Sequence, residues 1–493
     1  MKDPVFTNTI ETITSGNLYE KISDHMANFI IIENVKHKFS KKTVKRRDTK
    51  TLNQTNFEAD IQSNILNNIT TIEDTRQAYS FFQKSFLNIL NQHAPFRLLT
   101  NKQQELEQKP WITKGILISI HVKSKWYRLF KKNQLPHHYK MFKTYRDMLN
   151  SLIRKSKKQY YKIYFAENQS NNKKKWSAIN SLLNRQGKSK NSDIFLNYNG
   201  KIITDQKAVS GKFNHYFTNV GENLSNKIPK PNTKFQDYLK NPNQHSFFIE
   251  ESTQHEVVDI IKAFGDNKAS DIFGISTKFV KLGGTTLARI ISILFNKSIN
   301  QGVFPDELKY AKVIPIHKSD SIFEVSNYRP ISLLPIFSKI FEKLMYARLI
   351  TFVKRNNILY NKQFGFQKNM STELAVNALI ENIVQTYEKK EQGICIFLDF
   401  AKAFDTVNHQ ILIDKLQYHG IRGSALDWFK SYLTNRMQCT AVGNTQSDLS
   451  YIKCGVPQGS VLGPLLFLLY INDIVNSSSL LKFILFADDT CLY

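Results

Sequence analysis

Apolar residues recur at helical spacing in several stretches of the second half of the chain. A repeat every three or four residues predicts amphipathic helices, and strict alternation or a short apolar run predicts strands. The predicted helices cover residues 337–352, 372–387, 407–416, 424–433 and 461–474. The last of these is apolar on every side, so we expect it to be fully buried. Residues 436–442 and 449–453 predict a β-hairpin across Gly443-Asn444.

Two apolar stretches near the C-terminal end carry acids. Gly393 to Leu398 is typical of a buried strand, and it ends at Asp399. Residues 482–493 predict two short strands joined by a tight turn, with Asp488 and Asp489 at the tip. Burying adjacent carboxylates is unfavourable unless a cation or a donor neutralises them, and Mg²⁺ prefers oxygen ligands. Aspartates are also common in surface turns, so a metal site and a solvated turn are both open here.

The first half of the chain changes character several times. Residues 1–37 precede a polar connector at 38–107, in which helical patterns occur near 61–72 and 78–90. Residues 108–190 form a basic region with amphipathic helical patterns, and residues 191–252 predict a loop-rich linker. The final domain is expected to run from 253 to 493.

The charge of the chain is strongly positive and unevenly distributed. Its 493 residues hold 68 Lys and Arg against 41 Asp and Glu, which gives a formal net charge of +27. Residues 108–190 alone hold 21 lysines and arginines against two acids, with aromatic residues interleaved. A charge run is often a solvated face, but this density favours contacts with the phosphates of nucleic acid. We expect the aromatic side chains to pack the helices together.

Three motifs occur in a defined order. Residues 397–407 read Phe-Leu-Asp-Phe-Ala-Lys-Ala-Phe-Asp-Thr-Val, residues 455–464 read Gly-Val-Pro-Gln-Gly-Ser-Val-Leu-Gly-Pro, and residues 486–489 read Phe-Ala-Asp-Asp. In this order they resemble the reverse transcriptase of non-LTR (LINE-type, jockey-like) retrotransposons. The resemblance implies an α+β fold with the fingers and palm of a right-hand polymerase, incomplete and without a thumb, preceded by the mostly helical basic region. It also implies RNA-directed DNA polymerase activity, a nucleotidyl transfer from dNTP to a primer 3′-hydroxyl on an RNA template.

The resemblance assigns roles to particular residues. Asp399, Asp488 and Asp489 would be the catalytic carboxylates, and with the carbonyl of Phe400 they would bind Mg²⁺, with Mn²⁺ as an alternative. Asp405 would be structural.

The nucleotide would be bound by residues from three other motifs. The expected residues are Lys318, Arg329, Phe404, Gln458 and Gly459. The two cations would hold the triphosphate. Phe404 would lie under the sugar and exclude a 2′-hydroxyl, or it would simply pack in the core. Gln458 and Gly459 would line the templating base pair, because glycine lets backbone approach the nucleotide closely.

The expected partners follow from the same resemblance. They are an RNA template, a DNA primer, dNTP and, in the parent element, target DNA, with no membrane. The N-terminus lacks the apolar core of a signal peptide, and no segment is long and apolar enough for a transmembrane helix. We therefore expect an intracellular protein of the cytoplasm and nucleus. The four cysteines form no CxxC pair, which argues against a zinc site or a disulfide framework.

Residues near both ends of the sequence indicate a chain that is truncated at each end. Ser23-Asp24-His25 before an apolar run resembles the last motif of an apurinic-type endonuclease, so residues 1–37 are interpreted as its C-terminal remnant. Tyr493 follows Asp489 by four residues, so we expect a chain truncated at both ends and a poor polymerase. The alternative function is a catalytically dead nucleic-acid-binding fragment of such an element. An RNA-templated RNA polymerase is a further alternative, against which the aromatic Phe404 argues.

Overall fold

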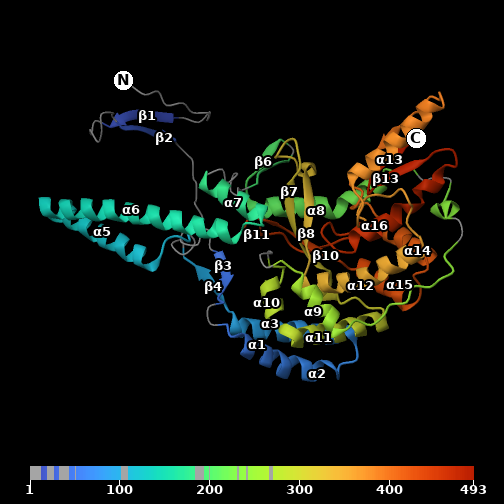
Figure 1. Cartoon of the computed structure of the whole chain (residues 1–493), viewed down its shortest axis with the longest axis horizontal. Helices are drawn as coiled ribbons and strands as arrows, with labels where there is room; N and C mark the ends of the chain where they lie inside the picture. Colours follow the sequence, from blue (N-terminus) through green and yellow to red (C-terminus); the bar gives the residue numbers. More distant parts are fainter. Residues whose placement is uncertain are drawn as a thin grey trace.

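The computed structural model describes residues 13–18, 27–32, 44–49, 52–100, 109–183, 194–198, 200–229, 233–239, 242–265 and 270–493. Helices and sheets are mixed in the α+β manner that the sequence predicts (Figure 1). Strands β1 (Ile13–Leu18) and β2 (Ala27–Ile32) pair antiparallel near the N-terminus. Asp24 and His25, the predicted endonuclease motif, lie outside the described residues.

Helices from both halves of the chain form the main core, in the lower part of Figure 1. They include α1 (Gln54–Ile61), η1 (Gln62–Leu66), α2 (Asn67–Ile69), α3 (Thr75–His93), α9 (Gln254–Lys262), α10 (Thr277–Leu282), α11 (Gly284–Gln301) and α12 (Ile336–Arg355). Phe82 of α3 and Phe337 of α12 meet edge to face, with ring centroids 5.0 Å apart. The segment predicted to be a connector therefore contributes buried helices to the same core as the C-terminal domain.

A five-stranded sheet lies beside this core. Its strands are β7 (Tyr310–His317), β8 (Tyr328–Leu333), β10 (Met437–Val442), β11 (Thr445–Gln446) and β12 (Ser450–Tyr451). β7 and β8 form an antiparallel hairpin, and β10 runs parallel to β7 and pairs antiparallel with β11 and β12. The hairpin predicted across Gly443-Asn444 is thus present, with β10 as its long strand.

Helix α8 (Gln206–Ser225) packs against this sheet, where Phe213 meets Tyr328 edge to face at 4.9 Å. The prediction of a loop-rich linker is therefore wrong for these residues. Val209, Phe213 and Phe217 recur at helical spacing, and the sheet buries them. Short hairpins flank the body: β3 (Val44–Arg47) with β4 (Phe96–Leu99), and β5 (Leu196–Tyr198) with β6 (Lys201–Ile203).

A second sheet carries the acidic motifs. Its strand order is β13 (Phe483–Phe486), β14 (Asp489–Leu492), β9 (Ile396–Leu398), all antiparallel. Helix α13 (Thr372–Glu388) contacts β13, and α14 (His409–Tyr418) contacts α15 (Ser424–Leu433) and α16 (Gly463–Ile471). α16 is buried in the main core, as its all-round apolar sequence predicts.

The prediction of a buried strand before Asp399 is wrong for β9. Ile396 is 48% exposed and Phe397 is 71% exposed. β9 is the last strand of its sheet, and among the described elements only β14 pairs with it. An apolar run alone cannot show whether a strand has neighbours on both sides.

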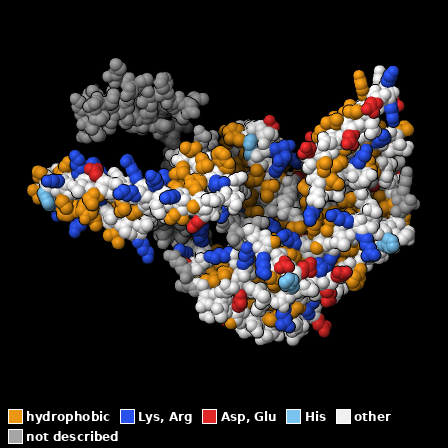
Figure 2. Space-filling model, in the orientation of Figure 1, with side chains coloured by type: hydrophobic (Ala, Val, Ile, Leu, Met, Phe, Trp, Pro, Cys, Tyr) orange, Lys and Arg blue, Asp and Glu red, His pale blue; other side chains and the backbone are white. Residues whose placement is uncertain are grey.

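The basic region forms an arm that projects from the body (Figure 1). Its helices are α5 (Lys114–Asn133), α6 (Pro136–Glu167) and α7 (Asn172–Leu182). Aromatic pairs join α5 to α6, with centroids 4.9 Å apart for Phe130 and Tyr139 and 5.0 Å apart for Tyr127 and Phe142. The predicted helices and their aromatic seam are thus confirmed, and Figure 2 shows lysines and arginines along the exposed arm.

Membrane-spanning character is lacking in the described helices: none is at once long and apolar enough to cross a bilayer.

Candidate active site

The two adjacent acids lie at the tip of the β13–β14 hairpin. Phe486 pairs with Asp489, so Ala487 and Asp488 form a two-residue turn. Ala487 has a φ of +58°, which such turns require and which glycine adopts more easily. Leu398 of β9 pairs with Thr490 of β14, and the next position along each strand places Asp399 beside Asp489. The sheet register therefore brings together carboxylates that are about ninety residues apart in sequence.

The three carboxylates interact electrostatically. Burial raises the pKa of Asp488, and repulsion from Asp489 and Asp399 raises it further, while Arg329 acts in the opposite direction. Asp488 is partly buried, but Asp399 and Asp489 are exposed, because the outer face of β9 is uncovered. Among the described residues, no ion pair neutralises any of them.

Three cations line the cleft together with the acids. Lys318 follows β7 directly, and Arg329 lies in β8 opposite Ile316. Lys402 has its pKa lowered by burial and by the nearby positive charges of Lys318 and Arg329, against the attraction of Asp405. The β7–β8 hairpin thus presents two predicted triphosphate ligands, and the segment after Asp399 adds a third cation.

These groups line one cleft of about 590 Å³. Its lining includes the predicted residues Lys318, Arg329, Asp399, Phe400, Phe404, Gln458, Gly459 and Asp488. Asp489 lies instead on an apolar groove of about 340 Å³, which it shares with Asp399. Every predicted site residue except Asp489 therefore lines the same space.

Phe404 is held in place by two other aromatic rings. It stacks on Phe467 of α16 with centroids 4.5 Å apart, and it meets Phe366 edge to face at 5.8 Å. Phe366 is 54% exposed and also lines the cleft. Both interpretations of Phe404 are compatible with this geometry, since the ring packs against α16 and also borders the cleft.

Asp405 holds Gln458 in position. The Gln458 Nε2 donates to Asp405 Oδ1 at 2.9 Å, and the Gln458 carbonyl accepts from the Ser332 amide at 2.8 Å. Burial raises the pKa of Asp405 to about 6, although the bond from Gln458 and the charge of Lys402 oppose the shift. Gly459 has a φ of +117°, and a Cβ there would lie 2.7 Å from the Ser332 carbonyl oxygen. In the structure, Gly459 therefore lets its backbone approach strand β8 closely.

All the residues that line the cleft lie in a part of the chain that matches a known family model. Residues 316–493 match the family model described as reverse transcriptase (RNA-dependent DNA polymerase). Residues 316–493 form a reverse transcriptase domain. Within the described residues, this domain contains both walls of the cleft: Arg329 and Lys318 on one side, Asp399 and Asp488 on the other.

Three relatives of the chain are proteins of mobile elements from Drosophila melanogaster. The chain is 34% identical over 245 residues to the "Probable RNA-directed DNA polymerase from transposon BS". It is 33% identical over 262 residues to the corresponding protein of transposon X-element, and 31% identical over 239 residues to that of mobile element jockey. These stretches cover 48%, 52% and 48% of this chain and 26%, 29% and 26% of the relatives. The chain thus spans about a quarter of each relative's length.

The carboxylates of the cleft are suitable ligands for a divalent cation, but they do not form a ready-made group of three ligands. No group of three or more His, Cys, Asp or Glu side chains among the described residues is close enough to bind a metal ion together. Asp399 and Asp488 nevertheless line the same cleft, and mutual repulsion contributes to the raised pKa of Asp488. Carboxylate oxygens are ligands that Mg²⁺ prefers. The metal-binding roles of Asp399, Phe400, Asp488 and Asp489 stay predictions.

Sequence reasoning missed three residues of this site. Lys402 stands inside the first motif and could have been found as a cation three residues after Asp399. Asp405 was expected to be structural, which agrees with its hydrogen bond from Gln458, but its place in the lining of the cleft was not predicted. Phe366 follows the Gln363-Phe364-Gly365 segment, and its approach to Phe404 depends on tertiary structure that no local pattern reveals.

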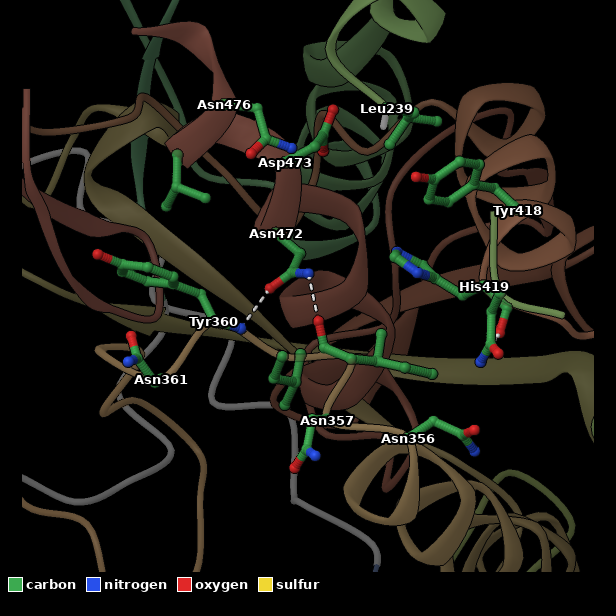
Figure 3. Close-up of a pocket in the computed structure, with 14 residues that line it drawn as sticks. Leu239, Asn356, Asn357, Tyr360, Asn361, Tyr418, His419, Asn472, Asp473 and Asn476 are labelled. Carbon is green, nitrogen blue, oxygen red and sulfur yellow. Dashed lines mark hydrogen bonds between the residues drawn. The ribbon is translucent and has the colours of Figure 1, made fainter. Parts of the chain in front are cut away.

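A larger cavity of about 790 Å³ lies elsewhere, between α14, η5 (Asn472–Ser477) and residues 356–361. Figure 3 shows asparagine amides around it, with Asn472 in the middle. The Asn472 Oδ1 accepts from the Tyr360 amide at 2.8 Å, which fixes the preceding loop. The carboxylate of Asp473 borders the cavity but forms an ion pair with Lys415. The cavity therefore lacks the paired carboxylates and free cations of the smaller cleft.

Proposed function

We propose that this chain is an RNA-directed DNA polymerase of a non-LTR mobile element. The observation that carries the proposal is the charge arrangement of the cleft. Asp399 and Asp488 border it from the β13–β14–β9 sheet, and Lys318 and Arg329 border it from the β7–β8 hairpin. Phosphoryl transfer from a nucleoside triphosphate requires both signs of charge: cations for the phosphates and carboxylates for the reacting end.

The proposed reaction joins the primer 3′-hydroxyl to the α-phosphate of dNTP and releases pyrophosphate. Lys318 and Arg329 would bind the triphosphate, and Lys402 would add a third positive charge beside them. Arg329 can present two parallel donors to a phosphate. Gln458, oriented by Asp405, would support the templating base pair, and Phe404 would lie against the sugar.

Asp399 and Asp488, with Asp489 and the Phe400 carbonyl, would hold Mg²⁺ or Mn²⁺. The bound cation would activate the attacking hydroxyl and neutralise the leaving pyrophosphate. The carboxylates of this chain would supply the oxygen ligands, and their mutual repulsion is the reason that they need a cation between them.

The nucleic-acid partners would be an RNA template and a DNA primer, with target DNA in the parent element. The arm of α5, α6 and α7 would bind the phosphate backbone, because its charge is concentrated on exposed helices (Figure 2). The intracellular location in cytoplasm and nucleus stays a prediction.

The proposed architecture is that of fingers and palm. The β7–β8 hairpin would belong to the fingers, and the β13–β14–β9 sheet with α16 to the palm. The shared core extends the proposed polymerase unit to include α1 and α3, ahead of the start predicted at residue 253. Residues 1–37 as an endonuclease remnant stay a proposal.

The experiment is single-nucleotide addition of dTTP to oligo(dT) on poly(rA), with Mg²⁺ and residues 1–493. We expect addition by the wild-type chain and its loss in Asp399→Asn and Asp488→Asn. Asp414→Asn, on the exposed side of α14, is the matched control and should retain the rate. Binding of primer–template without any addition that depends on Asp399 would contradict the proposal and favour a nucleic-acid-binding fragment without turnover.

A further inference from the structure

The segment Lys362 to Gly365 adds a further strand-like neighbour to the catalytic hairpin. Gln363 forms a parallel bridge with Leu485 of β13. The Phe364 amide donates to the Leu485 carbonyl at 2.7 Å, and the Leu485 amide donates to the Lys362 carbonyl at 3.0 Å. The segment therefore covers the edge of β13 that β14 leaves open.

The side chain of Gln363 reaches from this segment to the turn that carries Asp488. Its Oε1 accepts from the Ala487 amide at 2.9 Å and from the Gly365 amide at 2.8 Å. Both partners are N–H donors, so the atom between them must be the amide oxygen. Gln363 is only 2% exposed, so water cannot easily replace it.

The turn needs this support because its backbone is unfavourable. Ala487 has a φ of +58°, a conformation that costs a residue with a Cβ about 1 kcal/mol or more. Ala487 is also buried, with 4% of its surface exposed, so its amide would lack a partner without Gln363. One side-chain oxygen thus satisfies the amide of the residue immediately before Asp488.

At position 365 the segment lies so close to the backbone of Ala487 that only glycine fits without a shift. A Cβ added to Gly365 would lie 2.2 Å from the Ala487 nitrogen. The absence of a side chain at Gly365 therefore lets the Gln363 oxygen reach both amides. This geometry links Gln363, Gly365 and Ala487 into one unit.

We propose that Gln363 is a positioning residue for Asp488: its amide oxygen fixes the strained turn of the β13–β14 hairpin and so sets the direction of the Asp488 carboxylate. The consequence for catalysis rests on the proposed polymerase function. The positioning itself does not, because it can be measured in the absence of turnover.

The first measurement is hydrogen–deuterium exchange of the peptide that covers residues 485–493. Gln363→Met keeps the size of the side chain and removes the acceptor, and Gln363→Glu restores an acceptor at the same reach. We expect exchange of the Ala487 amide to rise about tenfold or more in Gln363→Met and to return toward the wild-type rate in Gln363→Glu. Gln385→Met, on exposed α13, is the matched control and should leave this exchange unchanged.

The second measurement is single-nucleotide addition by the same variants as a function of Mg²⁺ concentration. We expect Gln363→Met to lower kcat about tenfold and to raise the Mg²⁺ concentration for half-maximal rate, with Gln363→Glu recovering both. Helical peptides from α11 should exchange at the wild-type rate in every variant, which excludes global unfolding.

The outcomes separate the two claims. Unchanged exchange at Ala487 in Gln363→Met would overturn the positioning role, whether or not the chain polymerises. Increased exchange with unchanged kcat and Mg²⁺ dependence would also overturn it. Increased exchange at Ala487 together with no Asp399-dependent addition by the wild-type chain would support the hairpin contact and contradict the proposed function.

Discussion

Replacing Gly365 by alanine should displace the Ala487-Asp488 turn of the β13–β14 hairpin without touching any charged residue of the cleft. The new Cβ would lie 2.2 Å from the Ala487 nitrogen and 2.8 Å from its Cα, whereas ordinary contacts begin at 3.4 Å. The neighbours are backbone atoms, so relief requires the turn to move by about 1 Å. A displacement of about 1 Å in a catalytic group can cost on the order of a hundredfold in rate.

The assay for Gly365→Ala is single-nucleotide addition with saturating dTTP and primer–template. We expect kcat to fall about a hundredfold, with affinity for primer–template unchanged, because the arm and the cationic wall are intact. The overpacking should also lower the free energy of unfolding by about 1–3 kcal/mol. Gly211→Ala in α8 is the control, since a Cβ there meets no atom within 4 Å. A Gly365→Ala rate within twofold of wild type would refute the reasoning.

Three further changes test other parts of the site. Phe404→Ala should admit ribonucleotides and lower the free energy of unfolding by about 3 kcal/mol, because the ring stacks on Phe467; unchanged deoxynucleotide preference would leave it a packing residue only. Asp405 has a pKa raised from 3.8 to about 6, so the folded state holds its proton more tightly and the free energy of unfolding should fall as the pH rises between these values. Urea titrations at each pH should show this fall reduced by on the order of 3 kcal/mol in Asp405→Asn. Asp271, whose pKa burial also raises to about 6, should keep its own contribution in the variant. An identical pH profile in the two proteins would contradict the buried carboxyl. Neutralising exposed lysines of α6 should weaken binding to unrelated RNAs alike and flatten the slope of log K against log salt concentration. An unchanged slope would exclude the arm as a phosphate-binding surface.

Local sequence was enough to find the β13–β14 hairpin. Short apolar runs lie on both sides of Asp488 and Asp489, and a two-residue turn is enough to join them as paired strands. The position of Asp399 beside them came from motif order, and the sheet register agrees with it. The helices 337–352 and 372–387 were also found nearly at their observed bounds, because their apolar spacing is regular.

Features that depend on distant partners were not predictable in this way. The apolar spacing of residues 57–90 indicates helices, but only the folded chain shows that their partner is the core around Phe337. Burial of β9 was overestimated because an apolar run does not reveal which strands or helices will cover it. The contact of Gln363 with Ala487 spans 124 residues, so no local pattern reveals it.

The central claim is that Asp399 and Asp488 bind the cation that the polymerase reaction requires. Its most direct test is a crystal structure of residues 1–493 soaked with Mn²⁺ and a non-hydrolysable dTTP analogue, with anomalous diffraction locating the metal. We predict Mn²⁺ between the Asp399 and Asp488 carboxylates, which should lie within about 6 Å of each other, and triphosphate oxygens against Lys318 and Arg329. Carboxylates on opposite faces of the sheet, or a metal and triphosphate bound outside this cleft, would contradict it.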